Sequence, residues 1–272
     1  MNQKSRGARS GESRAMSKLS DTISDIAVMT RRSVLKYVRL PQLLVFNVML
    51  NVVLLLLFNY VFGGAVKTGG IAYIQYFLPG FLGQTVVFGS TQTSVGIAED
   101  LSKGLIDRFR SLPMARSAFL AGRVLADSLR YTLLIALMVA VGVGMGFRFG
   151  GSAGPVIAAM ALIILFGIAL TWIAIFIGMS VKNVEAAQVA GFVWVFPLVY
   201  ASSLYVPIET MPGWLQAFAR INPVTSMVDA VRAMMLGTSF SVWWLWKSLA
   251  WDAGIILVFL PLALRRYRLL AQ

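Results

Sequence analysis

Hydrophobic residues gather in long runs that are separated by short polar segments along most of the chain. Six of these runs have about 20 residues or more, the length that an α-helix needs to cross ~30 Å of hydrocarbon. The runs are residues 41–62, 72–97, 119–147, 155–181, 186–206 and 243–264. Inside a bilayer, a segment this apolar must satisfy its backbone hydrogen bonds internally, which a helix does. The pattern therefore predicts an all-α polytopic membrane protein with six transmembrane helices in one domain, residues 41–272.

An amphipathic segment, residues 19–40, precedes the first predicted span. Apolar positions recur at three- and four-residue spacing from Leu19 to Tyr37, and basic residues lie beside the membrane entry. This pattern predicts an interfacial helix that anionic lipid holds on the membrane surface. A helix in that position could also act as a lever for a cytoplasmic motor. Residues 1–18 are basic and rich in glycine and serine, which is typical of a disordered cytoplasmic tail.

The loop between the second and third predicted spans, residues 98–117, is the most polar segment in the middle of the chain. It contains EDLSKGLIDRFRSLPMAR, from Glu99 to Arg116. Apolar residues at helical spacing predict a short amphipathic helix from Ser102 to Arg110, which Pro113 ends. Such a helix can dock in a groove of a soluble partner, or it can lie on the lipid headgroups. The spacing alone favours neither.

Prolines break the moderately apolar segment between the fifth and sixth predicted spans, residues 207–238. Two short helices fit here. The first begins near Pro212, and the second has Asn222 as its N-cap, Pro223 at its first position and Gly237 at its end. Each helix is too short to cross a bilayer, so the segment is predicted to form a re-entrant helical hairpin on the outer side.

Basic residues are distributed unevenly between the two sides of the predicted membrane domain. One side carries only Lys67, Arg148, Arg220, Arg232 and Lys247, and all the other lysines and arginines fall on the opposite side. Because basic loops stay in the cytoplasm, both termini and the polar loop after the second span are predicted to be cytoplasmic. The same loops account for the formal net charge of +13, so we expect a lipid bilayer and no nucleic acid as a partner.

Composition excludes several kinds of chemistry. Hydrophobic residues make up 58% of the 272 residues and charged residues 13%, against about 25% charged in a soluble domain. The chain has no cysteine or histidine, which excludes disulfides, thiolate or imidazole metal ligands and histidine acid–base catalysis. It also has no GxxxxGK[ST] phosphate-binding loop. We therefore expect no catalytic, cofactor-binding or metal-binding residues, and a protein that is not an enzyme.

Three ionisable residues lie at the start of the third predicted span. Arg123, Asp127 and Arg130 share one helix face, with Asp127 in reach of both arginines. They are expected to be either a neutralised structural anchor at the cytoplasmic boundary or a relay between the loop and the spans. Asp252, in the sixth predicted span, is the most isolated charge. The spans carry no chain of ionisable residues, which gives proton coupling little support.

Two stretches give the chain a resemblance to a known family. They are EDLSKGLIDRFRSLPMARSAFLAGRVLAD, from Glu99 to Asp127, and VPIETMPGWLQAFARINPVTSMVDAVRAMMLG, from Val206 to Gly237. Both resemble the membrane subunits of ABC-2 type exporters, in particular the DrrB/DrrC-type daunorubicin-resistance permeases, over about residues 20–270. The first stretch is also similar to the EAA loop of ABC importers, although it departs from the strict importer sequence.

The resemblance implies a permease subunit in the cell (cytoplasmic) membrane that exports a hydrophobic or amphipathic drug-like molecule. ATP and magnesium would bind a separate ABC ATPase subunit, present in two copies. A second membrane subunit, the same chain or a paralogue, would complete the pump. Residues 19–40 would be a connecting helix, and residues 98–117 would couple to the ATPase. The implied coupling residues are Glu99, Asp100, Lys103, Gly104, Asp107, Arg108, Arg110 and Pro113.

The family also implies that substrate passes along the interface between the membrane subunits, where the second and fifth spans line the path. The candidates are Phe81, Gln84, Thr85, Phe88, Trp194, Phe196 and Tyr200. Helix packing is the other explanation for these side chains. Two alternative functions stay open: an ABC-2 permease that exports a lipid or glycan, and a channel or carrier without a motor.

Overall fold

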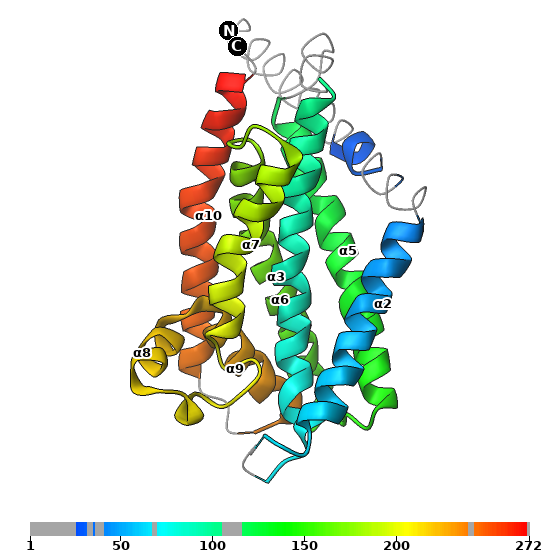
Figure 1. The fold of residues 1–272 in the computed structure, drawn as a ribbon, viewed down its shortest axis with the longest axis vertical. Helices are drawn as coiled ribbons and strands as arrows, with labels where there is room; N and C mark the ends of the chain where they lie inside the picture. Colours follow the sequence, from blue (N-terminus) through cyan, green and yellow to red (C-terminus); the bar gives the residue numbers. More distant parts are fainter. Residues whose placement is uncertain are drawn as a thin grey trace, which may run out of the picture.

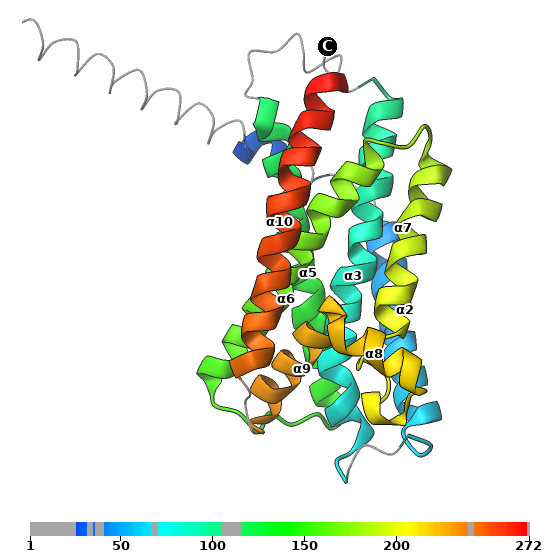
Figure 2. The same cartoon turned by 90° about the vertical axis from the view of Figure 1, so that its left-hand side faces the viewer.

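The computed structural model describes residues 26–31, 35, 41–66, 70–104, 116–238 and 242–270, and these contain helices and no strand. The long helices are α2 (Pro41–Leu57), α3 (Tyr73–Ser102), α5 (Arg116–Gly144), α6 (Ala153–Gly178), α7 (Val184–Tyr200) and α10 (Val242–Leu270). They stand side by side and run alternately up and down, with the short helices α8 (Gly213–Ile221) and α9 (Pro223–Leu236) at one end (Figures 1 and 2). The predicted all-α architecture is confirmed for the described residues.

Within the described residues, three helices are long and apolar enough to cross a membrane on their own: α5 from Phe119, α6 and α10. Shorter apolar helices are Val48–Phe62, which includes the π-helix η1 (Phe58–Phe62), and Val184–Tyr200. The helix α3 is as long as these spans, but its glycine, serine and threonine residues make it less apolar. Small residues suit a helix that packs against protein on several sides rather than against lipid.

The helix α3 is the centre of the bundle, because α5, α6, α7 and α9 all pack against it. Glycines allow this close approach. A Cβ atom on Gly83 would lie 2.3 Å from the Met227 side chain of α9, and one on Gly80 would lie 3.0 Å from Leu204. Large side chains such as Phe77 and Phe166 fill the remaining interior. Burial on all sides therefore depends on small side chains along α3.

The helix α2 lies at the periphery and leans away from the bundle (Figure 1). Among its described side chains, only Leu55 is fully buried, whereas Phe46, Met49 and Leu50 are exposed. These apolar side chains lie on the surface of the single chain, so lipid or another subunit must cover them in a membrane.

The boundary of the fifth predicted span differs from the prediction, since α7 ends at Tyr200 rather than near residue 206. Polar side chains donate hydrogen bonds to the backbone carbonyl groups at this end of the helix. The Asn222 amide donates to the carbonyls of Leu198 and Ala201, at 2.8 Å each, and the Ser202 hydroxyl donates to Val199 at 2.6 Å. Serine and asparagine that bond nearby backbone groups favour a helix end over its continuation.

The outer segment holds the short 3₁₀ turn η2 (Ile208–Thr210) and the helices α8 and α9. Asn222 caps α9 by accepting from the Val224 N–H at 2.9 Å, and Gly237 ends the helix with a φ of 63°. The helix α9 packs against α3, α6 and α10 and is largely buried. It is therefore part of the protein core rather than a surface segment.

Of the predicted interfacial helix, only residues 26–31 and 35 are described, and they are helical. Met29 is buried where this segment crosses α5 at Gly122. A Cβ atom on Gly122 would lie 2.5 Å from the Met29 Cβ atom, so only glycine permits the crossing at this distance. The predicted basic tail, residues 1–18, lies outside the described residues.

Candidate functional site

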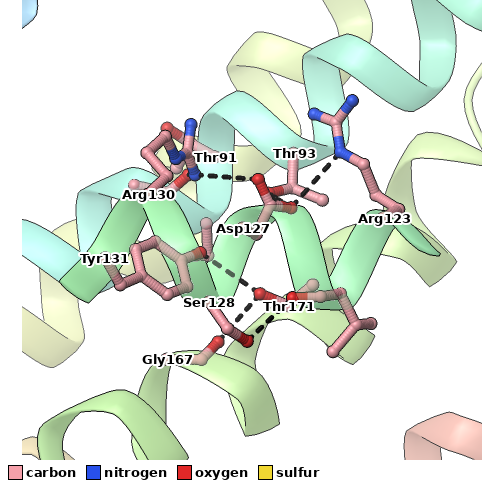
Figure 3. Close-up of polar contacts among 12 residues, drawn as sticks. Thr91, Thr93, Arg123, Asp127, Ser128, Arg130, Tyr131, Gly167 and Thr171 are labelled. Carbon is pink, nitrogen blue, oxygen red and sulfur yellow. Dashed lines mark hydrogen bonds and ion pairs between the residues drawn. The ribbon is translucent and has the colours of Figure 1, made fainter. Parts of the chain in front are cut away.

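A buried ion cluster joins the helices at one end of the bundle (Figure 3). Asp127 of α5 is fully buried, and its carboxylate is 3.2 Å from Arg123 Nε and 3.3 Å from Arg130 Nη2. The Thr93 hydroxyl of α3 donates to the same carboxylate at 2.7 Å. We call these four residues the Asp127 cluster. The helical spacing that the sequence suggested brings all three charges onto the face of α5 that meets α3.

The surface of α3 that receives this cluster is a stripe of small residues, Gly89, Thr93 and Gly96. A Cβ atom on Gly96 would lie 2.5 Å from the Arg123 guanidinium, and one on Gly89 would lie 2.8 Å from the Tyr131 ring. The Gly89 carbonyl accepts from Arg130 Nη2 at 2.8 Å. The two helices run in opposite directions, so Gly96 lies against Arg123, Thr93 against Asp127 and Gly89 against Arg130 and Tyr131.

A third helix holds the other side of the cluster. The Tyr131 ring follows Arg130, whose guanidinium carbon lies 5.1 Å from the ring centroid. The Tyr131 hydroxyl lies 3.2 Å from the Thr171 hydroxyl of α6, which donates to the Gly167 carbonyl at 2.8 Å. Gly167 makes room for the ring, since its Cβ atom would lie 2.9 Å from it. Polar contacts thus connect α3, α5 and α6 in one network (Figure 3).

This arrangement is suited to holding helices rather than to catalysis. A carboxylate between two guanidinium groups is a strong contact inside a protein, and loss of one partner would leave a buried charge uncompensated. Within the described residues, no group of three acidic side chains could hold a metal ion. The cluster therefore connects α5 with α3, and Tyr131 extends the contacts to α6.

An apolar cluster lies next to it and reaches the loops at the same end. It consists of Met29, Ile97, Phe119, Leu120, Val124, Ile175, Met179, Ala263 and Tyr267. These residues come from the segment 26–31 and from α3, α5, α6 and α10. The segment 26–31 is therefore packed against the same cluster as four of the long helices.

The predicted coupling segment begins inside α3. Glu99 and Asp100 lie in the last helical turn, where Glu99 is 3.8 Å from the exposed Lys103 ammonium group. Gly104 follows with a φ of 63°, the left-handed conformation that ends helices and favours glycine. The predicted short helix therefore does not start at Ser102, which is the last residue of α3. The predicted coupling residues that lie outside the described part are Asp107, Arg108, Arg110 and Pro113.

The predicted substrate-path residues of α3 divide into two groups. Phe81, Gln84 and Thr85 are buried in the bundle, and Gln84 Oε1 accepts from the Tyr205 hydroxyl at 2.6 Å. Phe88 lies further along the helix and is only partly buried. Phe81 is thus a core residue in the single chain, which agrees with helix packing as the explanation for this side chain.

The predicted residues of α7 continue from Phe88 as a row of aromatic rings. Ring centroids are 5.6 Å apart between Phe88 and Phe196, 5.4 Å between Phe196 and Tyr200, and 5.3 Å between Tyr200 and Tyr205. Phe196 is 46% exposed and Tyr200 is 50% exposed, so the row lies on the surface between α3 and α7. Trp194 points elsewhere on α7 and packs on the core.

A second polar network, which the sequence did not suggest, lies at the opposite end. Arg232 of α9 donates to Asp229 at 2.8 Å, to the Tyr76 carbonyl at 3.0 Å and to the Ser203 carbonyl at 2.9 Å. Its guanidinium carbon is 3.8 Å from the Tyr76 ring centroid. The Ser203 hydroxyl donates to Asp229 at 2.7 Å. This network fixes α9 to α3 and to the turn after α7.

Comparison with known proteins decides the family. The model of the ABC-2 type transporter family matches residues 24–236, which include the amphipathic entry, the Asp127 cluster and α9. The chain belongs to the ABC-2 type transporter family. It is therefore a multi-pass membrane permease subunit, and ATP hydrolysis resides in a separate subunit of the transporter.

Several curated permeases are similar to this one. The daunorubicin resistance permease DrrB1 of Streptomyces coeruleorubidus is 36% identical over 87% of this chain and 83% of its own length. The probable doxorubicin resistance permease DrrC of Mycobacterium tuberculosis is 29% identical over 65% of this chain and 64% of its own. The probable multidrug permease YbhR of Escherichia coli is 23% identical over 65% and 49%.

The sequence reasoning missed the partners of the Asp127 cluster on α3 and α6. A signal was present, because Gly89, Thr93 and Gly96 repeat the spacing of the three charges on α5. Small residues at that spacing are typical of close helix contacts in membranes. Thr171 and Tyr131 carried no such signal, since a threonine and a tyrosine in apolar helices have many possible partners.

Proposed function

We propose that this permease is the six-span membrane subunit of an ATP-driven exporter that moves hydrophobic or amphipathic drug-like molecules out across the cytoplasmic membrane. Two ATPase subunits bind ATP and magnesium, and a second membrane subunit, the same chain or a paralogue, completes the pump. The observation that carries the proposal is the convergence of segment 26–31, the end of α3 and the start of α5 on one buried apolar cluster beside the Asp127 ion pairs. The names of the similar permeases support drug export.

The proposed topology has six spans with both termini in the cytoplasm. The alternate direction of the six long helices supports it (Figure 1), and so does the uneven distribution of basic residues among the segments that connect them. Cysteines introduced at Ser17 and Gln272 should react with an impermeant reagent only from the cytoplasm. Cysteines at Gln216 and Thr238 should react only from outside, and labelling of either pair from the wrong side contradicts the topology.

Coupling would proceed through the Asp127 cluster. Closure of the ATPase subunits would press on the end of α3 around Gly104 and on the segment 26–31, which rests on α5 at Gly122. The hydrogen bonds from Thr93 to Asp127 and from Arg130 to the Gly89 carbonyl would make α3 and α5 move together, because separating the helices would leave these buried polar groups without partners. The bundle would then switch between inward- and outward-facing states as a packed unit.

Substrate would pass along the face that carries the aromatic row of Phe88, Phe196, Tyr200 and Tyr205. The exposed rings offer flat apolar contact area, and the Tyr200 hydroxyl adds a polar group. A second membrane subunit placed against α3 and α7 would cover this face and enclose a path. The same rings would also suit lipid chains, so they support transport of amphipathic molecules without fixing their class.

A substitution at Gly104 tests the coupling role. Gly104→Val forces a β-branched residue into the left-handed conformation, whereas Gly104→Asn tolerates it. In the purified complex with its ATPase subunit, Gly104→Val should lose drug-stimulated ATP hydrolysis and export, and Gly104→Asn should keep both. Gly146→Val is the control, because it also strains a glycine of positive φ, here 101°, which has open space at the other end of the bundle. Equal loss in both valine variants would contradict a coupling role.

The alternatives predict different results with the same complex. A lipid or glycan exporter would hydrolyse ATP faster with the lipid or glycan and would not respond to drugs. A channel or carrier without a motor would retain no ATPase subunit through purification in mild detergent, and transport would continue without ATP.

A further inference from the structure

The helix α10 buries two polar side chains that have no hydrogen-bond partner. Asp252 is 1% exposed and Ser248, one turn earlier on the same face, is fully buried. Among the residues that the structure describes, neither carboxylate oxygen of Asp252 nor the hydroxyl of Ser248 makes a hydrogen bond. Each of these atoms has less than 1 Å² of accessible surface, so no space for a water molecule adjoins them. A buried polar group without a partner is rare and calls for an explanation.

Nothing on the helices packed against α10 neutralises Asp252. The helix packs on α6 and α9, and α6 has no ionisable residue between Ala153 and Gly178. The ionisable residues of α9 are Asp229 and Arg232, and they bind each other and groups near α3. No described cation forms an ion pair with Asp252.

The charged residues of α10 itself are also directed elsewhere. Lys247 donates to the Arg220 carbonyl, and its ammonium group lies 5.2 Å from the Trp244 ring centroid. The other ionisable residues of the helix are Arg265, Arg266, Tyr267 and Arg268. They begin 13 residues further on, which is roughly 20 Å along a helix. An ionised Asp252 would therefore be a bare charge inside the membrane domain, which is strongly unfavourable.

We propose that Asp252 is a proton-binding site of the membrane domain, which holds its proton in this packed conformation and releases it when α10 separates from α6 and α9. A proton is the ligand that the packing admits, because the oxygens adjoin no space for water or a larger cation. In the step, one carboxyl O–H bond forms with a proton taken from water and breaks when the proton returns to water. No other bond changes.

The consequence is that proton concentration biases the conformation of the permease. Low pH favours the packed state around Asp252, and high pH favours a state in which water reaches the carboxylate. A single site needs no chain of ionisable residues across the membrane, so it agrees with their scarcity in the spans. The proposed proton site is also compatible with any transported substrate, since proton binding at Asp252 does not involve the transported molecule.

Infrared spectroscopy of the purified permease tests the protonation state directly, without a transport assay. At neutral pH, in a detergent that has no ester carbonyl, the wild type should show a carboxylic-acid C=O band that shifts when aspartate is ¹³C-labelled. The band should be lost in Asp252→Asn and kept in Glu209→Gln, a control that removes an exposed carboxylate of the outer turn. A labelled wild type without such a band, or a band that persists in Asp252→Asn, would overturn the proposal.

The pH dependence of thermal stability gives a second measurement. In the unfolded chain the Asp252 carboxyl is exposed to water and ionises above about pH 4, whereas the proposed site holds its proton in the packed conformation. Unfolding then releases a proton, so wild-type stability should fall as pH rises above about 4. Asp252→Asn should lose this slope, and equal slopes in the two proteins would overturn the proposal.

A cationic ligand is the competing outcome. If the band is absent in the wild type and a drug with an ammonium group stabilises the wild type but not Asp252→Asn, the carboxylate binds that ammonium group. This result would also overturn the proton site, while the export function proposed above would stand.

Discussion

Two buried aspartates show how differently one membrane domain treats the same side chain. Asp127 of α5 has an arginine on each side and a hydrogen bond from Thr93. Asp252 of α10 is buried to almost the same degree and has no partner among the described residues. The first is a fixed charge whose partners are all in place. The second is the group for which we propose a bound proton.

The difference follows from the neighbouring helices. The helix α3 offers α5 a stripe of glycine and threonine, so long arginine side chains fit between the two helices and reach Asp127. The helix α6 meets α10 with apolar side chains along its whole length. Arg123 and Arg130 of its own helix neutralise Asp127, and the loss of either arginine would leave a buried charge uncompensated, whereas Asp252 has no such ion pair among the described residues. We infer that the end of the bundle with the Asp127 cluster transmits force from the ATPase subunit. We also infer that α10 responds to the proton concentration through Asp252.

Asp127→Asn should cause the largest loss of stability. The amide leaves two buried arginines without a countercharge, and breaking a buried ion pair typically costs about 3–5 kcal/mol. Thermal unfolding in detergent should show a large drop or no folded protein. As a control, Glu99→Gln removes an exposed pair with Lys103 and should cost about 1 kcal/mol or less. If the two variants lose the same stability, the Asp127 cluster does not hold the helices.

Asp229→Asn should have a smaller effect. Asp229 accepts from Ser203 and from Arg232, and a hydrogen bond to a charged group contributes about 1.5–3 kcal/mol. Arg232 keeps its bonds to the Tyr76 and Ser203 carbonyls, so it is not left without partners. The same unfolding assay should place this variant between Asp127→Asn and the wild type. Asp127 pairs with two arginines and Asp229 with one. A loss of stability as large as that of Asp127→Asn would show that the number of paired arginines does not determine the size of the loss.

Gly96→Ala should cost about 1 kcal/mol. The new Cβ atom lies 2.5 Å from the Arg123 guanidinium and displaces it, at about 1–3 kcal/mol, while alanine returns up to about 1 kcal/mol of helix stability. Gly254→Ala in α10 is the matched control, because no atom lies within 4 Å of its Cβ position. That variant should be as stable as the wild type or more so. A Gly96→Ala protein as stable as the control would contradict the close contact.

Asp252→Asn should cause no loss of stability at all. The amide has the shape of a neutral carboxylic acid and introduces no charge, so the packing around α10 stays the same. Together with Asp127→Asn it gives the sharpest form of the comparison, since the same chemical change removes a needed charge at one site and replaces one neutral group by another at the other site. A stability loss as large as that of Asp127→Asn would mean that Asp252 is ionised and paired.

The amino-acid sequence by itself determined the helical class, the membrane setting and the order of the long helices. Apolar runs long enough to cross hydrocarbon leave a helix as the structure that satisfies the backbone, whatever the neighbouring segments do. The caps of α9 were local in the same sense, because Asn222 and Gly237 act on their own helix. Helical spacing likewise put Arg123, Asp127 and Arg130 on one face.

Tertiary structure alone decided which helix each face meets. The contact of Arg123, Asp127 and Arg130 with Gly89, Thr93 and Gly96 depends on how α3 and α5 are placed relative to each other. Thr93 and Asp127, which form a hydrogen bond, are 34 residues apart in the sequence. The end of α7 was likewise decided by Asn222, which lies 24 residues beyond the Leu198 carbonyl that it binds. Asp252 looked isolated in the sequence, but its burial without a partner depends on the apolar surfaces of α6 and α9. A pattern of apolar residues specifies that a face is buried, and the neighbour's side chains determine whether a charge on that face finds a partner.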